Sequence, residues 1–198
     1  MTRYLYLARH GEARPDQSGL TANGRRQAEL LGQRLQSVQF AAVHHSPLPR
    51  AVETAQLLGL NVPLQSSDLA GDYIPYLPSA AELPADSADE LLNFLAQFTP
   101  DEIATGAELG PQAIERFTGP TDEDRRELVI THNFLIAWLV RHALDAPPWR
   151  WLTLNHCNAA LTVLRYTPNR PATVAFFNDM THLPPNLQWT GFPPELRL

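Results

Sequence analysis

The most constraining feature of the sequence is an alternation between short apolar runs and longer segments whose apolar residues recur every three or four positions. A short run has the length of a buried strand, and the longer spacing places apolar side chains on one face of a helix. Strands that alternate with helices predict an α/β protein. We therefore expect three layers, α/β/α, around a mostly parallel central sheet. The predicted strands are residues 3–8, 40–43, 62–65 and 128–130.

Local signals define the helices that we expect. Thr21 is placed to cap a helix that runs to about Gln36. A last helix over residues 133–144 is apolar nearly all round, which indicates that it is buried. Gly110-Pro111 is expected to kink or end the helix that precedes it. The other predicted helices are residues 49–58 and two that begin at capping-box patterns, Ser87 with Glu90 and Thr99 with Glu102.

The remaining segments indicate how the chain is organised. Residues 66–85 are rich in Pro, Ala, Ser and Asp and are expected to form a loop. Residues 159–166 and 173–177 lie on either side of a Pro-Asn-Arg-Pro turn and predict a hairpin. No repeat or low-complexity linker divides the sequence. We predict a single domain over residues 1–198, with a lid or specificity segment at about 66–118.

Basic side chains follow three of the predicted strands, at the point where each strand ends. The first strand runs into Arg9-His10-Gly11, the second into His44-His45-Ser46 and the fourth into Thr131-His132-Asn133. Arg50 lies one turn into the helix that follows the second strand. Because ligands bind outside the carboxyl ends of strands in open α/β sheets, these residues are expected to share one site. Arginine, histidine and helix N-termini suit an anion, and phosphate is the natural candidate.

The residue composition excludes several classes of function. All 15 basic residues are arginine, so the chain has neither a Schiff-base lysine nor the lysine of a phosphate-binding P-loop. The net charge of -6, with no long basic run, argues against nucleic acid as a partner. Cys157 is the only cysteine, which excludes an intrachain disulfide and a cysteine-based metal site and fits a reducing cytoplasm.

The sequence gives no signal for a membrane or for export. No apolar run approaches the roughly 20 residues of a membrane span. The apolar stretch near the N-terminus is too short for a signal peptide. We therefore expect a cytoplasmic protein with no membrane partner. The oligomeric state stays open.

Four segments carry a resemblance to a known family. The segment LARHGEA, at residues 7–13, resembles the Arg-His-Gly signature of the histidine phosphatase superfamily, also called the phosphoglycerate mutase-like family. Three later segments resemble further blocks of that family, in the same order and at similar spacing: LTANGRRQAELLGQRL, HHSPLPRAVETAQLL and LVITHN. The similarity spans residues 3 to about 165. It implies a phosphoglycerate mutase-like fold.

The resemblance implies a role for each basic residue of the predicted site. His10 would be the nucleophile that becomes transiently phosphorylated. The phosphoryl group would be bound by Arg9, Arg50 and His132, the last in its protonated form and therefore also part of the catalysis. Neutral imidazole, with an ordinary pKa of about 6.5, is available as a nucleophile at neutral pH, and arginine donates paired hydrogen bonds to phosphoryl oxygens. Asn133, at the start of the last predicted helix, is expected to bring a helix N-terminus to the phosphate.

The sequence departs from the family at the general acid. Members of the family usually carry a glutamate in a loop after the third strand, and the corresponding position here is Gly71. We expect the next residue, Asp72, to be the acid. The apolar residues 73–75 around it would desolvate the carboxylate and raise its pKa, as an acid requires. Glu82 is the second choice and Asp68 a weaker one.

Together these residues predict a metal-independent phosphatase that hydrolyses phosphomonoesters through a phosphohistidine intermediate. No cofactor is expected, and Arg9 and Arg50 would repel a metal ion close to them. The substrate, a small phosphorylated molecule or a phosphoprotein, stays open. One alternative is phosphoglycerate mutase-type transfer, which the Ala13 after Glu12 and the lack of a Trp-Asn pair disfavour. The other is a weakly catalytic domain that binds phosphorylated ligands.

Overall fold

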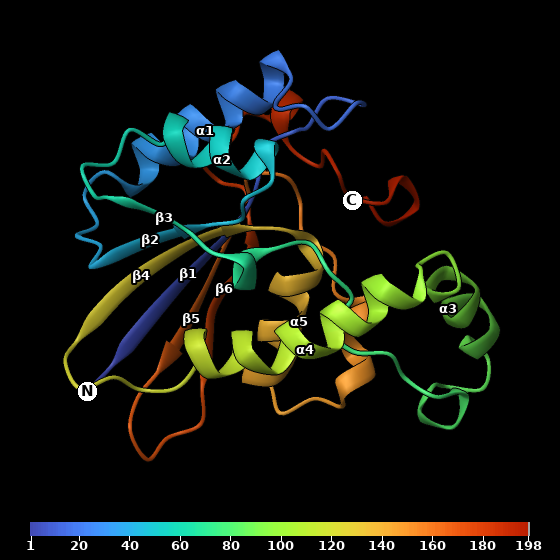
Figure 1. Cartoon of the computed structure of the whole chain (residues 1–198). Helices are drawn as coiled ribbons and strands as arrows, with labels where there is room; N and C mark the ends of the chain where they lie inside the picture. The colour runs from blue at the N-terminus through green and yellow to red at the C-terminus, as the bar shows by residue number, and fades with distance from the viewer. Residues whose placement is uncertain (198) are drawn as a thin grey trace.

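The computed structural model describes residues 1–197. A six-stranded sheet forms the middle of the molecule (Figure 1). Its strands are β1 (Arg3–Arg9), β2 (Ala42–His45), β3 (Leu64–Ser66), β4 (Arg125–Thr131), β5 (Leu161–Tyr166) and β6 (Thr173–Asp179). They lie in the order β3-β2-β4-β1-β5-β6. The first four strands pair in parallel, whereas β5 runs antiparallel to β1 and β6 runs antiparallel to β5.

Helices cover both faces of this sheet. They are α1 (Ala22–Leu35), α2 (Pro49–Leu57), α3 (Ala88–Leu95), α4 (Pro100–Phe117) and α5 (Asn133–Ala143). One apolar cluster joins α1 and α2 to the sheet, and a larger one joins α4 and α5 to it. The two helix layers lie on opposite sides of the strands (Figure 1). The predicted three-layer α/β/α fold with a mostly parallel sheet is therefore confirmed.

Two of the three predicted helix caps are formed. Thr21 Oγ1 accepts a hydrogen bond from the N–H of Gly24 at 3.0 Å and begins α1. Thr99 and Glu102 form a complete capping box at the start of α4, in which the Glu102 carboxylate accepts the Thr99 N–H at 2.8 Å. Ser87 precedes α3 but makes no side-chain cap bond, so the capping box predicted there is wrong.

Helix α4 continues past Pro111, so of the two outcomes predicted for Gly110-Pro111, a kink or an end, the end is wrong. Gly106 and Gly110 lie on the face of α4 that packs against the backbone of Ile74 and Pro75. A Cβ at Gly106 would lie 2.0 Å from the Ile74 carbonyl oxygen, and one at Gly110 would lie 2.6 Å from the Pro75 carbonyl oxygen. Beyond the proline, Ala113 and Phe117 continue the buried face of the helix. The packing of the two glycines fixes the segment that directly follows the predicted acid.

Strand β2 begins two residues later than predicted and contains His44 and His45. Phe40, predicted as its first residue, instead packs edge to face against Tyr6 of β1, with ring centroids 5.1 Å apart. Both histidines pair with β3 on one side and β4 on the other. They therefore belong to the sheet and not to the loop beyond it.

The segment 66–118 contains short 3₁₀ turns followed by α3 and α4. Helix α3 lies to the side of the sheet (Figure 1). The single domain and the lid role of this segment stay predictions. Within the described residues 1–197, no helix combines the length and the apolar character that a membrane span requires.

Candidate active site

The backbone around His10, just beyond the end of β1, is held from three sides. The His10 N–H donates to the Thr131 carbonyl at the end of β4, at 3.0 Å. The His10 carbonyl accepts from Asn158 Nδ2 at 3.1 Å. The next N–H, that of Gly11, donates to Thr54 Oγ1 of α2 at 3.0 Å. The His10 side chain, only 6% exposed, is thus fixed at the carboxyl edge of the parallel strands.

The two ring nitrogens of His10 have different partners, and these define the tautomer. Nδ1 lies 2.7 Å from the Gly11 carbonyl oxygen, which only accepts hydrogen bonds, so Nδ1 carries the proton. Nε2 accepts a hydrogen bond from Arg50 Nε at 3.1 Å and keeps its lone pair. Burial, and then the charge of Arg9, lowers the pKa of His10 to about 3. The imidazole is therefore neutral at pH 7.

Arg50 connects His10 to the predicted acid. It lies in the first turn of α2, and its Nη2 donates to Asp72 Oδ2 at 2.8 Å. The guanidinium is 11% exposed and the carboxylate 33%. Burial raises the pKa of Asp72, whereas the charges of Arg50 and Arg9 oppose the rise. The structure therefore brings the predicted nucleophile and the predicted acid to opposite ends of one guanidinium.

Arg9 is held by two backbone carbonyls. Its Nη1 donates to the His156 carbonyl at 2.6 Å and to the Gly191 carbonyl at 2.7 Å. Its Nε is buried without a hydrogen-bond partner. Since a buried guanidinium donor with no partner is costly, the geometry suits a ligand that accepts hydrogen bonds.

His132 caps the start of α5 and is almost fully buried. Its Nε2 lies 2.8 Å from Ser46 Oγ, and its Nδ1, which has no hydrogen-bond partner, lies 3.6 Å from Asp72 Oδ2. Its ring centroid is 5.0 Å from that of His10. Burial, and then His10 and the arginines, hold the pKa of His132 well below its ordinary value. These surroundings favour the neutral imidazole, and protonation of His132 beside a phosphate dianion stays a prediction.

A pocket of about 340 Å³ opens at these side chains. The predicted site residues among its lining are Arg9, His10, Arg50 and Asp72. Three segments that are far apart in the sequence thus meet in one pocket, where Arg9 and Arg50 lie with the carboxylates of Asp72 and Glu12.

Several other candidates lie elsewhere. The Oδ1 of Asn133 accepts the His156 N–H at 2.7 Å, and this residue lines a different pocket, so its side chain does not support the predicted phosphate contact. Glu82 accepts hydrogen bonds from Tyr76 and Ser79 within its own turn and does not line the His10 pocket. His44 lies beside Arg116, away from the site.

The lining residues that the sequence analysis missed include Asn158 and Gly191. Both come from the C-terminal part of the chain. Asn158 precedes β5, and because β5 is antiparallel to β1, its beginning lies at the same edge as the end of β1. The polar residues before a predicted hairpin strand are the signal that could have indicated Asn158. Gly191 belongs to an irregular segment for which the sequence offers no such signal.

Metal binding has no support from the side-chain arrangement. Within residues 1–197, no group of three or more His, Cys, Asp or Glu side chains could hold a metal ion. The positive charges at the His10 pocket would also oppose a cation.

Comparison with known proteins assigns this chain to a family. The model of the histidine phosphatase superfamily (branch 1) matches residues 5–72 and 77–179. A relative from Caenorhabditis elegans, named serine/threonine-protein phosphatase Pgam5, mitochondrial, is 31% identical over 189 residues, which cover 93% of this chain and 66% of the relative. The chain therefore spans just under two thirds of the length of that relative.

Solved structures share the fold. A phosphoserine phosphatase mutant from Entamoeba histolytica, in complex with phosphoserine, matches with a TM-score of 0.65 at 20% identity. The match covers 92% of this chain and 100% of that chain. A phosphoglycerate mutase from Plasmodium falciparum matches with a TM-score of 0.61 at 22% identity, over 92% of this chain and 94% of that one. The predicted phosphoglycerate mutase-like fold is thus confirmed.

These findings correct one expectation and confirm another. The relative is named as a mitochondrial protein, so the predicted cytoplasmic location is wrong. The relative and one of the structures are named as phosphatases, which is the predicted class of enzyme. The family model covers most of the sequence, including the segments that carry Arg9, His10, Arg50 and His132. This chain belongs to the histidine phosphatase superfamily.

Proposed function

We propose that this chain is a phosphatase that hydrolyses phosphomonoesters through a covalent phosphohistidine at His10. The observation that carries the proposal is the state of the His10 ring. Its proton is held on Nδ1 by the Gly11 carbonyl, and Nε2 presents a lone pair beside Arg50. A pKa of about 3 keeps the imidazole in this nucleophilic form at pH 7.

The first half-reaction moves the phosphoryl group to the enzyme. Nε2 of His10 attacks phosphorus, a P–N bond forms, and the P–O bond to the leaving group breaks. Arg9 and Arg50 bind the phosphoryl oxygens and stabilise the charge spread over them in the transition state. Asp72 gives its proton to the leaving oxygen. The raised pKa of Asp72 favours the protonated form that this step needs.

The second half-reaction returns the enzyme to its starting state. Water attacks phosphorus, the carboxylate of Asp72 takes a proton from it, and the P–N bond breaks. Inorganic phosphate leaves, and His10 regains the lone pair on Nε2. The same residue thus serves as acid and then as base.

His132 supports both steps as a hydrogen-bond donor. The Leu48 N–H donates to Ser46 Oγ at 3.2 Å, which leaves the Ser46 hydroxyl free to donate to Nε2 of His132. That arrangement assigns the ring proton of His132 to Nδ1, the nitrogen on the side of Asp72. A bound phosphoryl dianion would raise the pKa of His132, so its protonation is coupled to substrate binding.

The proposal extends to the domain organisation and to the cofactor. One domain would carry the whole site, with the segment 66–118 as its lid and specificity segment. The packing of α4 against Ile74 and Pro75 supports this, because it joins the later part of the segment to the residues that follow Asp72. Arg9 and Arg50 supply the positive charge that the phosphoryl group needs, so the reaction would proceed without a metal or cofactor.

The substrate class is a phosphomonoester of a small molecule or of a protein. The C. elegans relative is named a serine/threonine-protein phosphatase, which favours phosphoserine and phosphothreonine residues. The partner of this chain would then be a phosphoprotein.

Hydrolysis of nitrophenyl phosphate and of a phosphoserine peptide tests the proposal, with and without a chelator. We expect the wild type to release phosphate from both substrates and to be insensitive to the chelator. His10→Ala should be inactive. The matched control is His142→Ala, at the far end of α5, which should retain activity. Phosphate release by His10→Ala at the wild-type rate would refute the covalent mechanism.

A further inference from the structure

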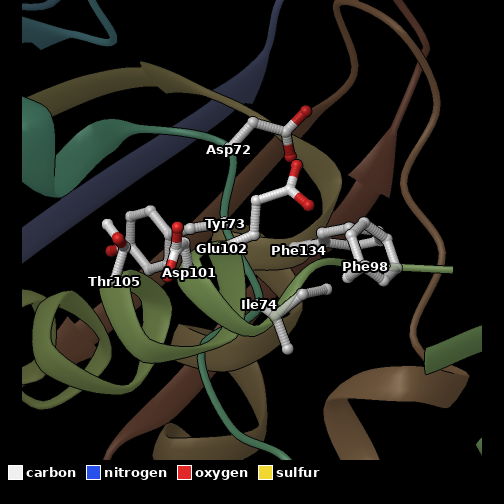
Figure 2. Close-up of a pocket in the computed structure, with 8 residues that line it drawn as sticks. All are labelled: Asp72, Tyr73, Ile74, Phe98, Asp101, Glu102, Thr105 and Phe134. Atoms are coloured by element: carbon white, nitrogen blue, oxygen red, sulfur yellow. The ribbon is translucent and has the colours of Figure 1, made fainter. Parts of the chain in front are cut away.

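A second pocket lies next to the His10 pocket and shares Asp72 with it. Its volume is about 390 Å³. Figure 2 shows that Asp72 stands at one end of it and that the other lining side chains come from the following segment, from the first turns of α4 and from Phe134 of α5. This second pocket is called the acidic pocket below.

The role of the acidic pocket is inferred from the proposed function, on which this inference rests. A general acid must lie within hydrogen-bond reach of the leaving oxygen. Asp72 is the one side chain that lines both pockets among the residues that the structure describes. With the phosphoryl group at His10 and the leaving oxygen at Asp72, the rest of the leaving group lies over Asp72 and enters the acidic pocket.

One wall of the acidic pocket is apolar and rigid. Phe98 and Phe134 pack edge to face, with ring centroids 6.2 Å apart, and Phe134 also packs against Trp151 at 5.1 Å. Ile74 and Tyr73, which also line the pocket, are buried. This wall would contact the carbon chain of a leaving group and exclude water from it.

The opposite wall is negatively charged. Asp101 and Glu102 lie in the first turn of α4, and both are exposed. Glu102 uses one carboxylate oxygen, Oε2, to accept from Thr99, and hydrogen bonds from Thr99 lower its pKa, so it stays ionised at neutral pH. The acidic pocket thus has three carboxylates and no basic side chain in its lining, whereas the lining of the His10 pocket includes Arg9 and Arg50.

We propose that the acidic pocket is a specificity site for phosphopeptides that carry an apolar residue and a basic residue next to the phosphorylated one. The two pockets together match a substrate with a phosphate at one end and a cation at the other. Each exposed ion pair contributes little by itself, so the two carboxylates together predict a preference of about threefold to tenfold.

The test compares two phosphoserine peptides that differ only in one flanking residue, arginine in one and the uncharged analogue citrulline in the other. The wild type should hydrolyse the arginine peptide with a kcat/KM about threefold to tenfold higher. The double variant Asp101→Asn with Glu102→Gln should reduce this ratio to about one. Glutamine preserves the capping box with Thr99, so the helix start is kept.

The matched control is the double variant Glu108→Gln with Glu115→Gln, which removes two exposed charges from the same helix outside the pocket. Its peptide ratio should equal that of the wild type. Its turnover of nitrophenyl phosphate should also equal that of the wild type, since Glu108 and Glu115 line neither pocket. A ratio of one in the wild type, or a ratio that survives in the Asp101/Glu102 variant, would overturn the proposal.

A binding measurement separates this inference from the proposed function. The dissociation constants of both peptides are measured for the His10→Ala variant, which needs no turnover. This variant should prefer the arginine peptide, and the preference should disappear when Asp101 and Glu102 are also neutralised. That result supports the proposed specificity even if no phosphomonoester is hydrolysed. Hydrolysis of nitrophenyl phosphate without any peptide preference in rate or binding rejects the pocket and leaves the phosphatase intact. The preference should also weaken at high salt.

Discussion

At the scale of single residues, Arg50 couples the two ends of the proposed chemistry. Its Nε donates to Nε2 of His10, and its Nη2 pairs with Asp72. The positive charge of Arg50 suits a phosphate. It also lowers the pKa of Asp72, whereas burial raises that pKa. The strength with which Asp72 holds its proton therefore depends on both its burial and Arg50.

The role of Asp72 predicts a dependence on the leaving group. An alkoxide needs a proton as it departs, whereas nitrophenolate needs little help. Asp72→Asn should therefore reduce hydrolysis of alkyl phosphates roughly 10²-fold more than hydrolysis of nitrophenyl phosphate. Steady-state kcat/KM values for both substrates measure this differential.

Glu82→Gln is the matched control for that prediction. Glu82 is bound within its own turn by Tyr76 and Ser79, so its substitution should leave both substrates equally affected. If Glu82→Gln shows the differential and Asp72→Asn does not, the acid has been assigned to the wrong residue.

Gly191 is predicted to position Arg9. Its φ of +68° is in the left-handed region, and a Cβ there would lie 2.2 Å from Asn158 Oδ1 and 3.0 Å from Arg9 Nη1. Gly191→Ala should therefore displace the guanidinium and lower kcat/KM for nitrophenyl phosphate by about tenfold, the loss expected for a weakened charge-assisted hydrogen bond.

Gly59 provides a control with a similar backbone. Its φ is +62°, but nothing lies within 4 Å of the position of a Cβ. Both alanine variants should lose about 1 kcal/mol of stability from the left-handed conformation. Only Gly191→Ala should lose activity. Equal kcat/KM values for the two variants would remove Gly191 from the positioning of Arg9.

The residues that could be predicted from the sequence share one property. Arg9, His10 and His132 follow parallel strands directly, and a common strand direction brings them to one edge of the sheet. Asn158 lies before an antiparallel strand, so the same rule did not indicate it. Asn133 is in the expected place along the chain, but its side chain has a backbone partner that only the tertiary structure reveals.

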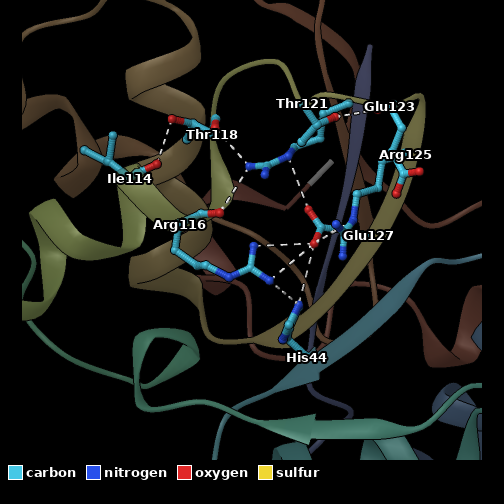
Figure 3. Close-up of polar contacts among 9 residues, drawn as sticks. His44, Ile114, Arg116, Thr118, Thr121, Glu123, Arg125 and Glu127 are labelled. Carbon is cyan, nitrogen blue, oxygen red and sulfur yellow. Dashed lines mark hydrogen bonds and ion pairs between the residues drawn. The ribbon is translucent and has the colours of Figure 1, made fainter. Parts of the chain in front are cut away.

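At the scale of elements, a buried charge cluster joins β4, β2, β1 and α4. Glu127 is fully buried in β4 and lies within ion-pair distance of four basic side chains (Figure 3). Its partners are Arg3 at 3.2 Å, His44 at 3.7 Å, Arg116 at 3.3 Å and Arg125 at 3.3 Å. The cluster accounts for His44, whose side chain the sequence had left as a candidate for the site.

Glu127→Gln should destabilise the protein strongly. Burial by itself raises the pKa of Glu127, but the hydrogen bond with His44 and the neighbouring arginines lower it to about 2. Removing this carboxylate leaves the buried guanidinium of Arg3 without its charged partner, which costs about 3–5 kcal/mol. Urea unfolding at pH 7 measures the loss. Glu29→Gln, at an exposed ion pair with Arg26, should lose less than about 1 kcal/mol.

The contribution of Glu127 to the free energy of unfolding should depend on pH. The pKa of Glu127 is about 2 in the folded state and near its ordinary 4.5 in the unfolded chain, so between these values the unfolded chain binds more protons. The contribution of Glu127 is complete above about pH 5 and is lost as the pH falls towards 2. The difference in unfolding free energy between wild type and Glu127→Gln should therefore shrink from pH 7 to pH 3. A constant difference would contradict the depressed pKa.

Helices and strands were predicted well where local signals and tertiary packing agree. The caps at Thr21 and Thr99 are local features, and both are formed. The shift of β2 and the passage of α4 through Pro111 depend on partners far along the chain. Phe40 packs against Tyr6, and the α4 glycines pack against Ile74 and Pro75. Local patterns alone therefore placed the start of β2 wrongly and left open whether α4 ends at Pro111.

At the scale of the whole molecule, the candidate site draws on nearly the full length of the described chain. The central position of β1, between β4 and β5, places His10 where residues from both halves of the sequence converge. The fold class followed from the alternation of strands and helices. The closure of the site by the C-terminal segment did not, because the contact between Gly191 and Arg9 has no periodic pattern in the sequence.

The covalent intermediate is the central claim, and trapping it is the most direct test. The wild type is mixed with a phosphomonoester, quenched rapidly without acid, and analysed by mass spectrometry and phosphorus NMR. The account predicts an acid-labile phosphoryl group on Nε2 of His10, because Nδ1 is occupied by the Gly11 carbonyl. His10→Ala should carry none. Turnover without any phosphohistidine, or a phosphoryl group on Nδ1 or on another residue, would contradict the account.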